Sequence, residues 1–113
     1  MNSSIEIEAE VVFLKPEEGG RNKLVFQGFR PTFIYDDNAW DADLHFDGED
    51  FLPNGLPRIV FFTFTSSERH VGKIFPDKRF ELWDGKVIAT GKVLRVVNLE
   101  QSAKNSGNRK GFK

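Results

Sequence analysis

Side chains that alternate between apolar and polar with a period of two dominate this chain. In segment 5–13 every odd position is apolar, whereas positions 6, 8 and 10 are glutamate. A helix would spread these apolar side chains around its whole axis, but a β-strand places them all on one face. We therefore predict a strand with one apolar face and a second face that begins charged.

Further segments have the same extended pattern. They are residues 24–35, 40–46, 59–65, 80–82 and 86–97. Turn residues separate them, and Asp84-Gly85 is the strongest hairpin signal. Pro31 cannot donate a backbone hydrogen bond, so we expect it at an edge, a bend or a bulge. About six strands without a convincing amphipathic helix predict an all-β domain, either a closed barrel or a sandwich.

Composition narrows the class of protein. The 113 residues are enough for one domain, and the 12 phenylalanines can fill a dense core. The lack of cysteine excludes disulfides and cysteine-based zinc sites. No apolar run approaches the roughly 20 residues of a membrane helix. The first residues do not resemble a signal peptide, so we expect a cytoplasmic protein without a membrane partner.

The alternating pattern ends near Asn98. Beyond it one acidic residue, Glu100, accompanies the basic residues Lys104, Arg109, Lys110 and Lys113. We predict a barrel domain over residues 1–97 and a flexible basic tail over residues 98–113. A tail of this modest charge suits a solubilising end better than an anion-binding site.

Sequence signals for catalysis fail on spacing. Segment 36–50 has seven acidic residues and no Lys or Arg, but its glycine lies two positions too late for a calcium loop. In segment 85–92 the two glycines are one residue too far apart for a phosphate-binding loop. His45 and His70 are distant in sequence, and each is expected on the surface. We predict a protein that is not an enzyme, with no metal site and no cofactor; a metal-dependent enzyme using segment 36–50 is the catalytic alternative.

Motifs in the first third of the chain are more specific than the periodicity. Segment 8–12 reads Glu-Ala-Glu-Val-Val, segment 18–21 reads Glu-Gly-Gly-Arg, and segment 26–33 reads Phe-Gln-Gly-Phe-Arg-Pro-Thr-Phe. Together they resemble the opening of the C-terminal, third domain of elongation factor Tu, with the same spacing between the motifs. Segments 52–55 and 79–93 resemble its later turn and final hairpin more weakly.

The resemblance implies a closed six-stranded antiparallel β-barrel. In that family the barrel contacts the T-stem backbone of aminoacyl-tRNA, packs against the GTPase and second domains, and touches the nucleotide exchange factor. No segment of this sequence resembles the GTPase domain, so the resemblance does not imply GTP hydrolysis. What it implies is a binding module on a translation-factor scaffold.

The same resemblance assigns two sets of residues. The positions that match the family's RNA-facing run and its last turn are Arg21, Asn22, Lys23, Thr32, Trp83, Asp84 and Gly85. At Trp83 the family has an arginine; a tryptophan there can stack on a base or contact a protein. The positions expected to be structural are Gly19, Gly20, Gly28, Arg30 and Pro31. The glycines suit positive backbone dihedrals, and Arg30 is expected to pair with a carboxylate.

The leading hypothesis is a non-catalytic binding module that engages a protein partner, with the translation machinery as its expected source. An acidic barrel body is poorly suited to phosphate contacts, and the RNA-facing residues are partly replaced. RNA binding, to tRNA in particular, around Arg21, Lys23, Arg30 and the basic tail is the alternative. Self-association is a further hypothesis, because the family's barrel packs against two neighbouring domains and that face is free here.

Overall fold

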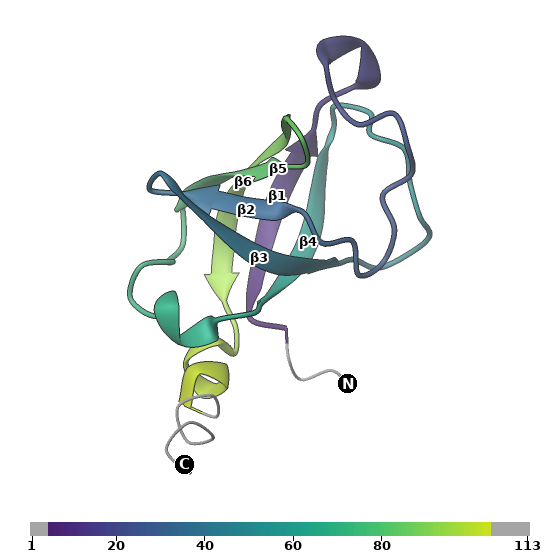
Figure 1. Cartoon of the computed structure of the whole chain (residues 1–113). Coiled ribbons are helices and arrows are strands. Elements are labelled where there is room, and N and C mark those ends of the chain that lie inside the picture. The colour runs from purple at the N-terminus through teal and green to yellow at the C-terminus, as the bar shows by residue number, and fades with distance from the viewer. Residues whose placement is uncertain (1–4, 105–113) are drawn as a thin grey trace.

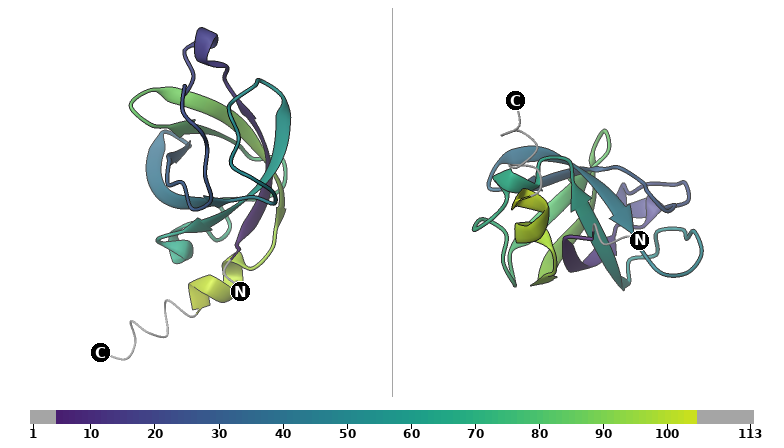
Figure 2. Two further views of the ribbon diagram at one scale, coloured as in Figure 1. Left: turned by 90° about the vertical axis from the view of Figure 1, so that its right-hand side faces the viewer. Right: turned by 90° about the horizontal axis from the view of Figure 1, so that it is seen from below.

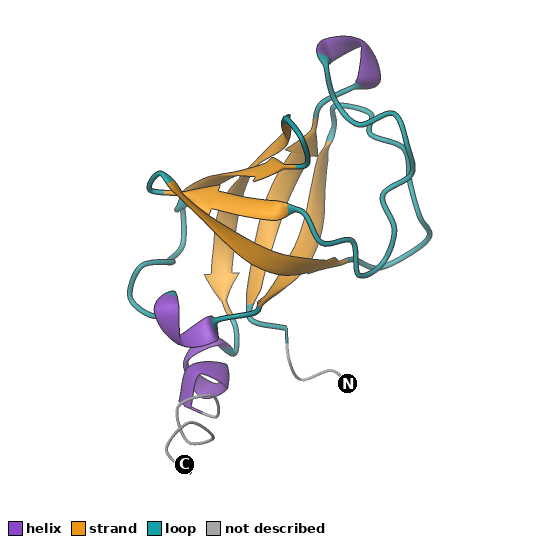
Figure 3. Ribbon diagram, in the orientation of Figure 1, coloured by secondary structure: helices purple, strands orange, loops and turns teal. Residues whose placement is uncertain are grey.

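The chain folds into a closed β-barrel. The computed structural model describes residues 5–104. Its strands are β1 (Ile7–Phe13), β2 (Thr32–Tyr35), β3 (Asn38–His45), β4 (Pro57–Phe64), β5 (Arg79–Trp83) and β6 (Val87–Val96). Antiparallel pairing connects them in the order β1-β4-β3-β2-β5-β6 and back to β1 (Figure 1, Figure 3). The prediction of an all-β, closed, six-stranded antiparallel barrel is confirmed.

Strand β1 closes the ring. It pairs with β4 on one side and with β6 on the other, so that Ile7 lies opposite both Phe62 and Val96. Burial alternates along β1 in the way that the sequence period predicts, with every odd position buried. The outward positions Glu8 and Glu10 carry the charge.

Glu6 departs from this alternation. Its side chain is buried, and one carboxylate oxygen accepts the backbone N–H of Phe64 at 2.9 Å. The other accepts the hydroxyl of Ser67 at 2.7 Å, on the short 3-10 turn η2 (Ser67–Arg69). A buried carboxylate is tolerated only where such donors meet it. Glu6 therefore belongs to the interior at one end of the barrel rather than to the charged face predicted for it.

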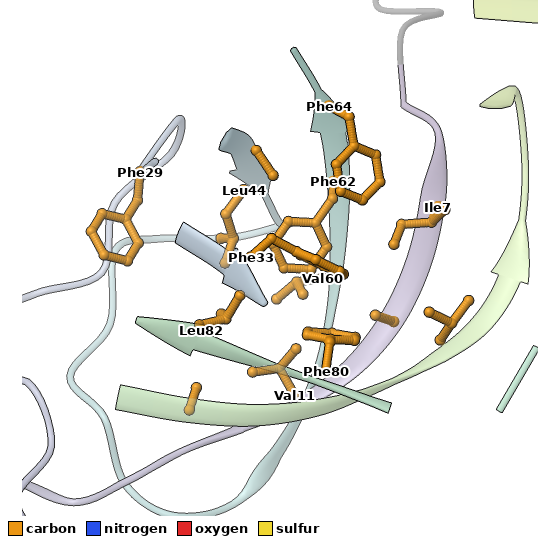
Figure 4. Packing of buried hydrophobic residues seen from close by; sticks show 14 of the residues in the cluster. Ile7, Val11, Phe29, Phe33, Leu44, Val60, Phe62, Phe64, Phe80 and Leu82 are labelled. Carbon is orange, nitrogen blue, oxygen red and sulfur yellow. The ribbon is translucent and has the colours of Figure 1, made fainter. Parts of the chain in front are cut away.

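Phenylalanine rings fill the interior. Phe33 lies at the centre, stacked on Phe80 with ring centroids 4.2 Å apart. The edges of Phe62 and Phe64 meet the same ring at 5.1 and 4.9 Å. Figure 4 shows these rings pointing inward from β2, β4 and β5. Offset stacks and edge contacts of this kind are the preferred aromatic geometries, so the phenylalanine-rich composition is explained by the core.

Gly91 makes room for this aromatic stack. It lies in β6 opposite Phe80, and a Cβ atom there would be 2.3 Å from the Cζ atom of the Phe80 ring. A glycine inside a strand is typical of a bend or of a close approach by a neighbouring group. The structure shows the close approach, with a ring rather than a backbone as the neighbour.

The extended region predicted over residues 24–35 is a strand only in its last four residues, as β2. Its first part is a loop that forms a single two-residue bridge between Val25 and Phe51. Gly28 has a positive φ of 80°, and Pro31 is buried just before β2. These two residues interrupt the extended region, which forms a strand only after Pro31.

The predicted boundary of the tail is wrong. Residues 99–104 are helical, and Leu99 is 2% exposed within the hydrophobic core. A lone apolar residue has no period, so the sequence pattern could not reveal its contact with the barrel. Residues 105–113, which hold the rest of the predicted basic tail, lie outside the described residues. Across residues 5–104, every helical segment falls short of the length and apolar character that a membrane crossing requires.

Replacement of Gly91 tests the aromatic packing. We expect Gly91→Ala to lower the free energy of unfolding by about 1–3 kcal/mol, because the new methyl group would overlap the ring of Phe80. In the double variant with Phe80→Leu, the loss of free energy of unfolding should be smaller than the sum of the losses in the two single variants. Urea denaturation measures each value, and Thr90→Ala on the exposed face of the same strand is the control. A Gly91→Ala variant as stable as the control would contradict this packing.

Candidate functional site

The residues that the sequence singled out gather from separate segments onto one part of the barrel. Thr32 of β2 lies directly opposite Trp83 of β5. Trp83 runs into the Asp84-Gly85 turn, where Gly85 has a φ of 78° and the Asp84 N–H bonds to the carbonyl of Lys86 at 2.8 Å. Arg21 reaches this turn from the loop after β1. The predicted hairpin turn is therefore present, and Arg21, which lies 63 residues from Asp84 in sequence, meets it.

Arg21 links the loop after β1 to the Asp84-Gly85 turn. We call Arg21 and its partners Leu24 and Asp84 the clamp. Its Nε and one terminal nitrogen donate to the carbonyl oxygen of Leu24 at 3.1 and 2.9 Å, and the other terminal nitrogen lies 3.2 Å from a carboxylate oxygen of Asp84. The guanidinium group also lies 4.5 Å from the ring centroid of Phe29. Its side chain is 14% exposed. Most of its donors and its charge are therefore used within the domain.

A small cavity lies beside this clamp. It has a volume of about 200 Å³ and is lined by Arg21, Asn22, Lys23, Asp84, Lys86 and Ile88. The basic side chains outnumber the single acidic one, and Lys23 and Lys86 are exposed. The cavity therefore keeps some positive character even though Asp84 neutralises Arg21.

The glycines expected to be structural have geometries that explain them. Gly19 ends the 3-10 turn η1 (Pro16–Glu18) with a φ of 93°, a conformation that favours glycine. At Gly20 a Cβ atom would lie 2.1 Å from the carbonyl oxygen of Leu14, so no side chain fits. Gly28 combines its positive φ with an N–H bond to the carbonyl of Leu44 at 2.9 Å.

Arg30 pairs with a carboxylate, as the sequence suggested. Its Nε donates to Asp43 on β3 at 2.7 Å. This hydrogen bond, together with the charge of Asp43, raises the pKa of Arg30 above its usual value. The guanidinium group is exposed, so the pair adds little to stability and mainly orients the start of β2 against β3.

Apolar side chains that the sequence analysis did not select form an exposed surface next to the clamp. Val25 and Phe51 exchange two backbone hydrogen bonds of 2.7 and 3.1 Å. Val25 points inward, so its neighbour Leu24 and the opposite residue Leu52 point outward on one face. Leu24, Phe26 and Leu52 are 48%, 44% and 58% exposed. We call these three side chains the loop surface. The run of three apolar residues, Leu24-Val25-Phe26, was the signal, because neighbouring side chains of an extended segment point to opposite faces and cannot all be buried on one of them.

The loops that carry the loop surface lie side by side. Figure 2 shows segments 19–31 and 47–56 crossing the same side of the barrel. The side chain of Gln27 bonds both to the carbonyl and, at 3.1 Å, to the N–H of Phe46, as a strand backbone would. Each loop is thereby tied to the other and to the end of β3. This arrangement holds the apolar side chains in fixed positions, as a recognition surface requires.

The acidic segment 36–50 is partly paired. Asp36 binds the ammonium group of Lys78 at 2.7 Å, and Asp43 binds Arg30. Within residues 5–104, no three or more Asp, Glu or His side chains come close enough together to hold a metal ion. The geometry therefore gives the metal-dependent alternative no ligand set in this part of the chain.

The prediction that His70 lies on the surface is wrong. His70 is fully buried, and its Nδ1 lies 2.7 Å from the hydroxyl of Tyr35. Burial is the main cause that lowers the pKa of His70 to about 4, and the charge of Lys73 adds to it. His45 is half-buried on β3, with its Nε2 3.4 Å from the hydroxyl of Thr63. The polar neighbours of His70 in sequence concealed a partner that lies 35 residues away.

No protein-family model matches the chain, and no curated protein matches it. The resemblance to the third domain of elongation factor Tu therefore stays a prediction.

Substitutions at Arg21 and Asp84 distinguish the parts of the clamp. We expect Arg21→Lys to lower the free energy of unfolding by about 1–2 kcal/mol, because lysine cannot bond to Leu24 and Asp84 together while it covers Phe29. Asp84→Asn should cost less than about 0.5 kcal/mol, because the carboxylate is exposed. Urea denaturation measures both variants. Equal costs would show that the ion pair, and not the bonds to the loop carbonyl, holds the loop.

Proposed function

We propose that this domain is a non-catalytic binding module that engages a protein partner through the loop surface. The observation that carries the proposal is the exposure of Leu24, Phe26 and Leu52 on loops tied down by backbone hydrogen bonds. Exposed apolar side chains that are fixed in place and rimmed by charge are typical of protein-binding surfaces. Trp83, which is 42% exposed, extends the apolar area beyond the clamp.

The environment of Arg21 favours a protein over RNA as the partner. In an RNA interface an arginine offers its donors to phosphate oxygens. Here the guanidinium group donates to Leu24 and Asp84, and its side chain is largely buried. The loop next to it carries Asp47, Glu49 and Asp50, which would repel a phosphate backbone. An apolar surface with an acidic rim suits a protein that offers apolar and basic side chains.

The resemblance to the third domain of elongation factor Tu suggests where to look for this protein. Three of its motifs, segments 18–21, 26–33 and 79–93, fall on the loop after β1, on the approach to β2 and on the final hairpin, which are the segments around the clamp. We therefore propose a partner that belongs to the translation machinery, and the nucleotide exchange factor of elongation factor Tu is the first candidate to test.

Site-specific crosslinking tests the loop surface. A photoreactive amino acid at position 52 should give a discrete adduct in cells, because Leu52 points outward at the centre of the proposed interface. The same substitution at Val71, an exposed apolar residue in the segment after η2, is the matched control. Excess unlabelled domain should compete for the adduct, whereas the Leu52→Lys domain should not.

Two outcomes of this experiment contradict the proposal. One is the same set of adducts from positions 52 and 71, which would indicate random contacts. The other is equal competition by the wild-type and Leu52→Lys domains. Mixing the purified domain with the purified exchange factor tests the identity of the partner separately, so a failure there removes only the translation assignment.

RNA binding is a second candidate, because Lys23 and Lys86 line the cavity beside the clamp. If the cavity holds a phosphate group, binding to tRNA should weaken steeply with salt, and Lys23→Ala and Lys86→Ala should each reduce the salt slope by about 1. Fluorescence anisotropy with labelled tRNA measures this. No binding at about 50 mM salt, or binding that is independent of salt, would exclude RNA.

A further inference from the structure

A second cavity lies away from the loop surface, on the side of the barrel where His70 is buried. It has a volume of about 280 Å³ and lies between β2, β3 and the segment that follows β4. The N–H of Thr65 bonds to the carbonyl of Asp41 at 3.2 Å, which fixes two of its walls to each other. A cavity of this size is at the small end of ligand sites, so its ligand would be smaller than a typical drug molecule.

Two of the side chains that line this cavity each carry a nitrogen atom without a partner. The Nε2 of His70 and the Nε1 of Trp40 are both buried, and neither has a hydrogen-bond partner among the described residues. Both residues line the cavity, and their rings meet edge to face with centroids 4.7 Å apart. A buried polar group without a partner costs roughly 1–3 kcal/mol, so two of them in neighbouring side chains call for an explanation.

Which nitrogen of the neutral His70 ring carries the proton decides what Nε2 offers to a ligand. When the Tyr35 hydroxyl donates to the Nδ1 of His70, at 2.7 Å, the proton of the neutral imidazole is on Nε2. Burial keeps the pKa of His70 at about 4, so the ring is neutral at neutral pH. Nε2 of His70 and Nε1 of Trp40 are then both donors. Trp40 is only half-buried, so its ring can turn to present its N–H to a ligand oxygen.

The remaining wall restricts the charge of the ligand. It offers the hydroxyl groups of Thr32, Thr65 and Ser66 and the carboxylate of Asp41, which is exposed. Among the described residues that line the cavity, none is Lys or Arg. An anion would meet the carboxylate without a compensating cation. A ligand with several hydroxyl groups can accept from the two ring nitrogens and donate to Asp41 at the same time.

We propose that this cavity binds a single sugar ring, a small neutral ligand with adjacent hydroxyl groups. The ring's hydroxyl oxygens accept from His70 and Trp40, and one of its hydroxyl groups donates to Asp41. A sugar ring of this kind occurs in free monosaccharides and glycan ends and also in nucleosides. The proposal does not depend on the protein-binding function of the loop surface, because the two sites share no residue.

Nuclear magnetic resonance of the tryptophan side chains tests the proposal directly. The chain has two tryptophans, and the Trp83→Phe variant assigns the indole N–H signal of Trp40. Glucose, galactose, mannose, ribose and adenosine are titrated separately, with inorganic phosphate as the anionic probe. We expect at least one sugar to shift the Trp40 signal with saturation. Preference for ribose and adenosine would identify a nucleoside as the source, and preference for a hexose would identify a free sugar or glycan.

Asp41→Asn provides the matched substitution. Asp41 is exposed, so the variant should fold, and the loss of a charged acceptor should weaken sugar binding by about 10-fold or more. Asp47→Asn, an exposed acid in the same acidic segment but outside the cavity, should leave binding unchanged. No saturable shift with any sugar would overturn the proposal. It would equally be overturned by sugar binding that Asp41→Asn leaves unaltered, or by a stronger response to phosphate.

Discussion

Backbone pairing of β1 with both β4 and β6 is the constraint on which the rest of the structure depends. Ile7 lies between Phe62 and Val96, so the first strand of the chain joins the fourth to the last. Closure leaves no sheet edge along β1 and forces alternate side chains into one interior. The phenylalanine stack around Phe33 and the buried carboxylate of Glu6 both form only when this ring is closed.

Closure of the barrel also fixes the positions of the long loops. Because the end of β3 is fixed in the ring, Leu44 can bond through its carbonyl to Gly28 and through its N–H to Phe29, at 2.9 and 2.8 Å. The bridge between Val25 and Phe51 then joins the second loop to the first. The loop surface is therefore an extension of the barrel rather than an independent segment. The cavity at His70 and Trp40 depends on the same ring, since β2 and β3 form its walls.

Local patterns in the sequence predicted the strands and turns, because these depend mainly on neighbouring residues. Alternation identified β1, and Asp84-Gly85 identified the turn between β5 and β6. Contacts between distant residues could not be predicted in this way. The burial of His70 depends on Tyr35, 35 residues away, and the role of Arg21 depends on Asp84, 63 residues away. The sequence selected several of the candidate residues. Only the structure shows which of them form the clamp, which apolar side chains form the loop surface and which residues line a cavity.

Amide hydrogen exchange of the free domain tests most directly whether the loops are fixed parts of the closed barrel. The N–H groups of Val25, Gly28 and Phe51 all donate to backbone carbonyls, at 2.7, 2.9 and 3.1 Å. We expect these three amides to exchange far more slowly than in an unstructured chain, with protection approaching that of the β1 amides. Exchange at the rate of an unstructured chain at these positions, while β1 stays protected, would contradict a preformed binding surface.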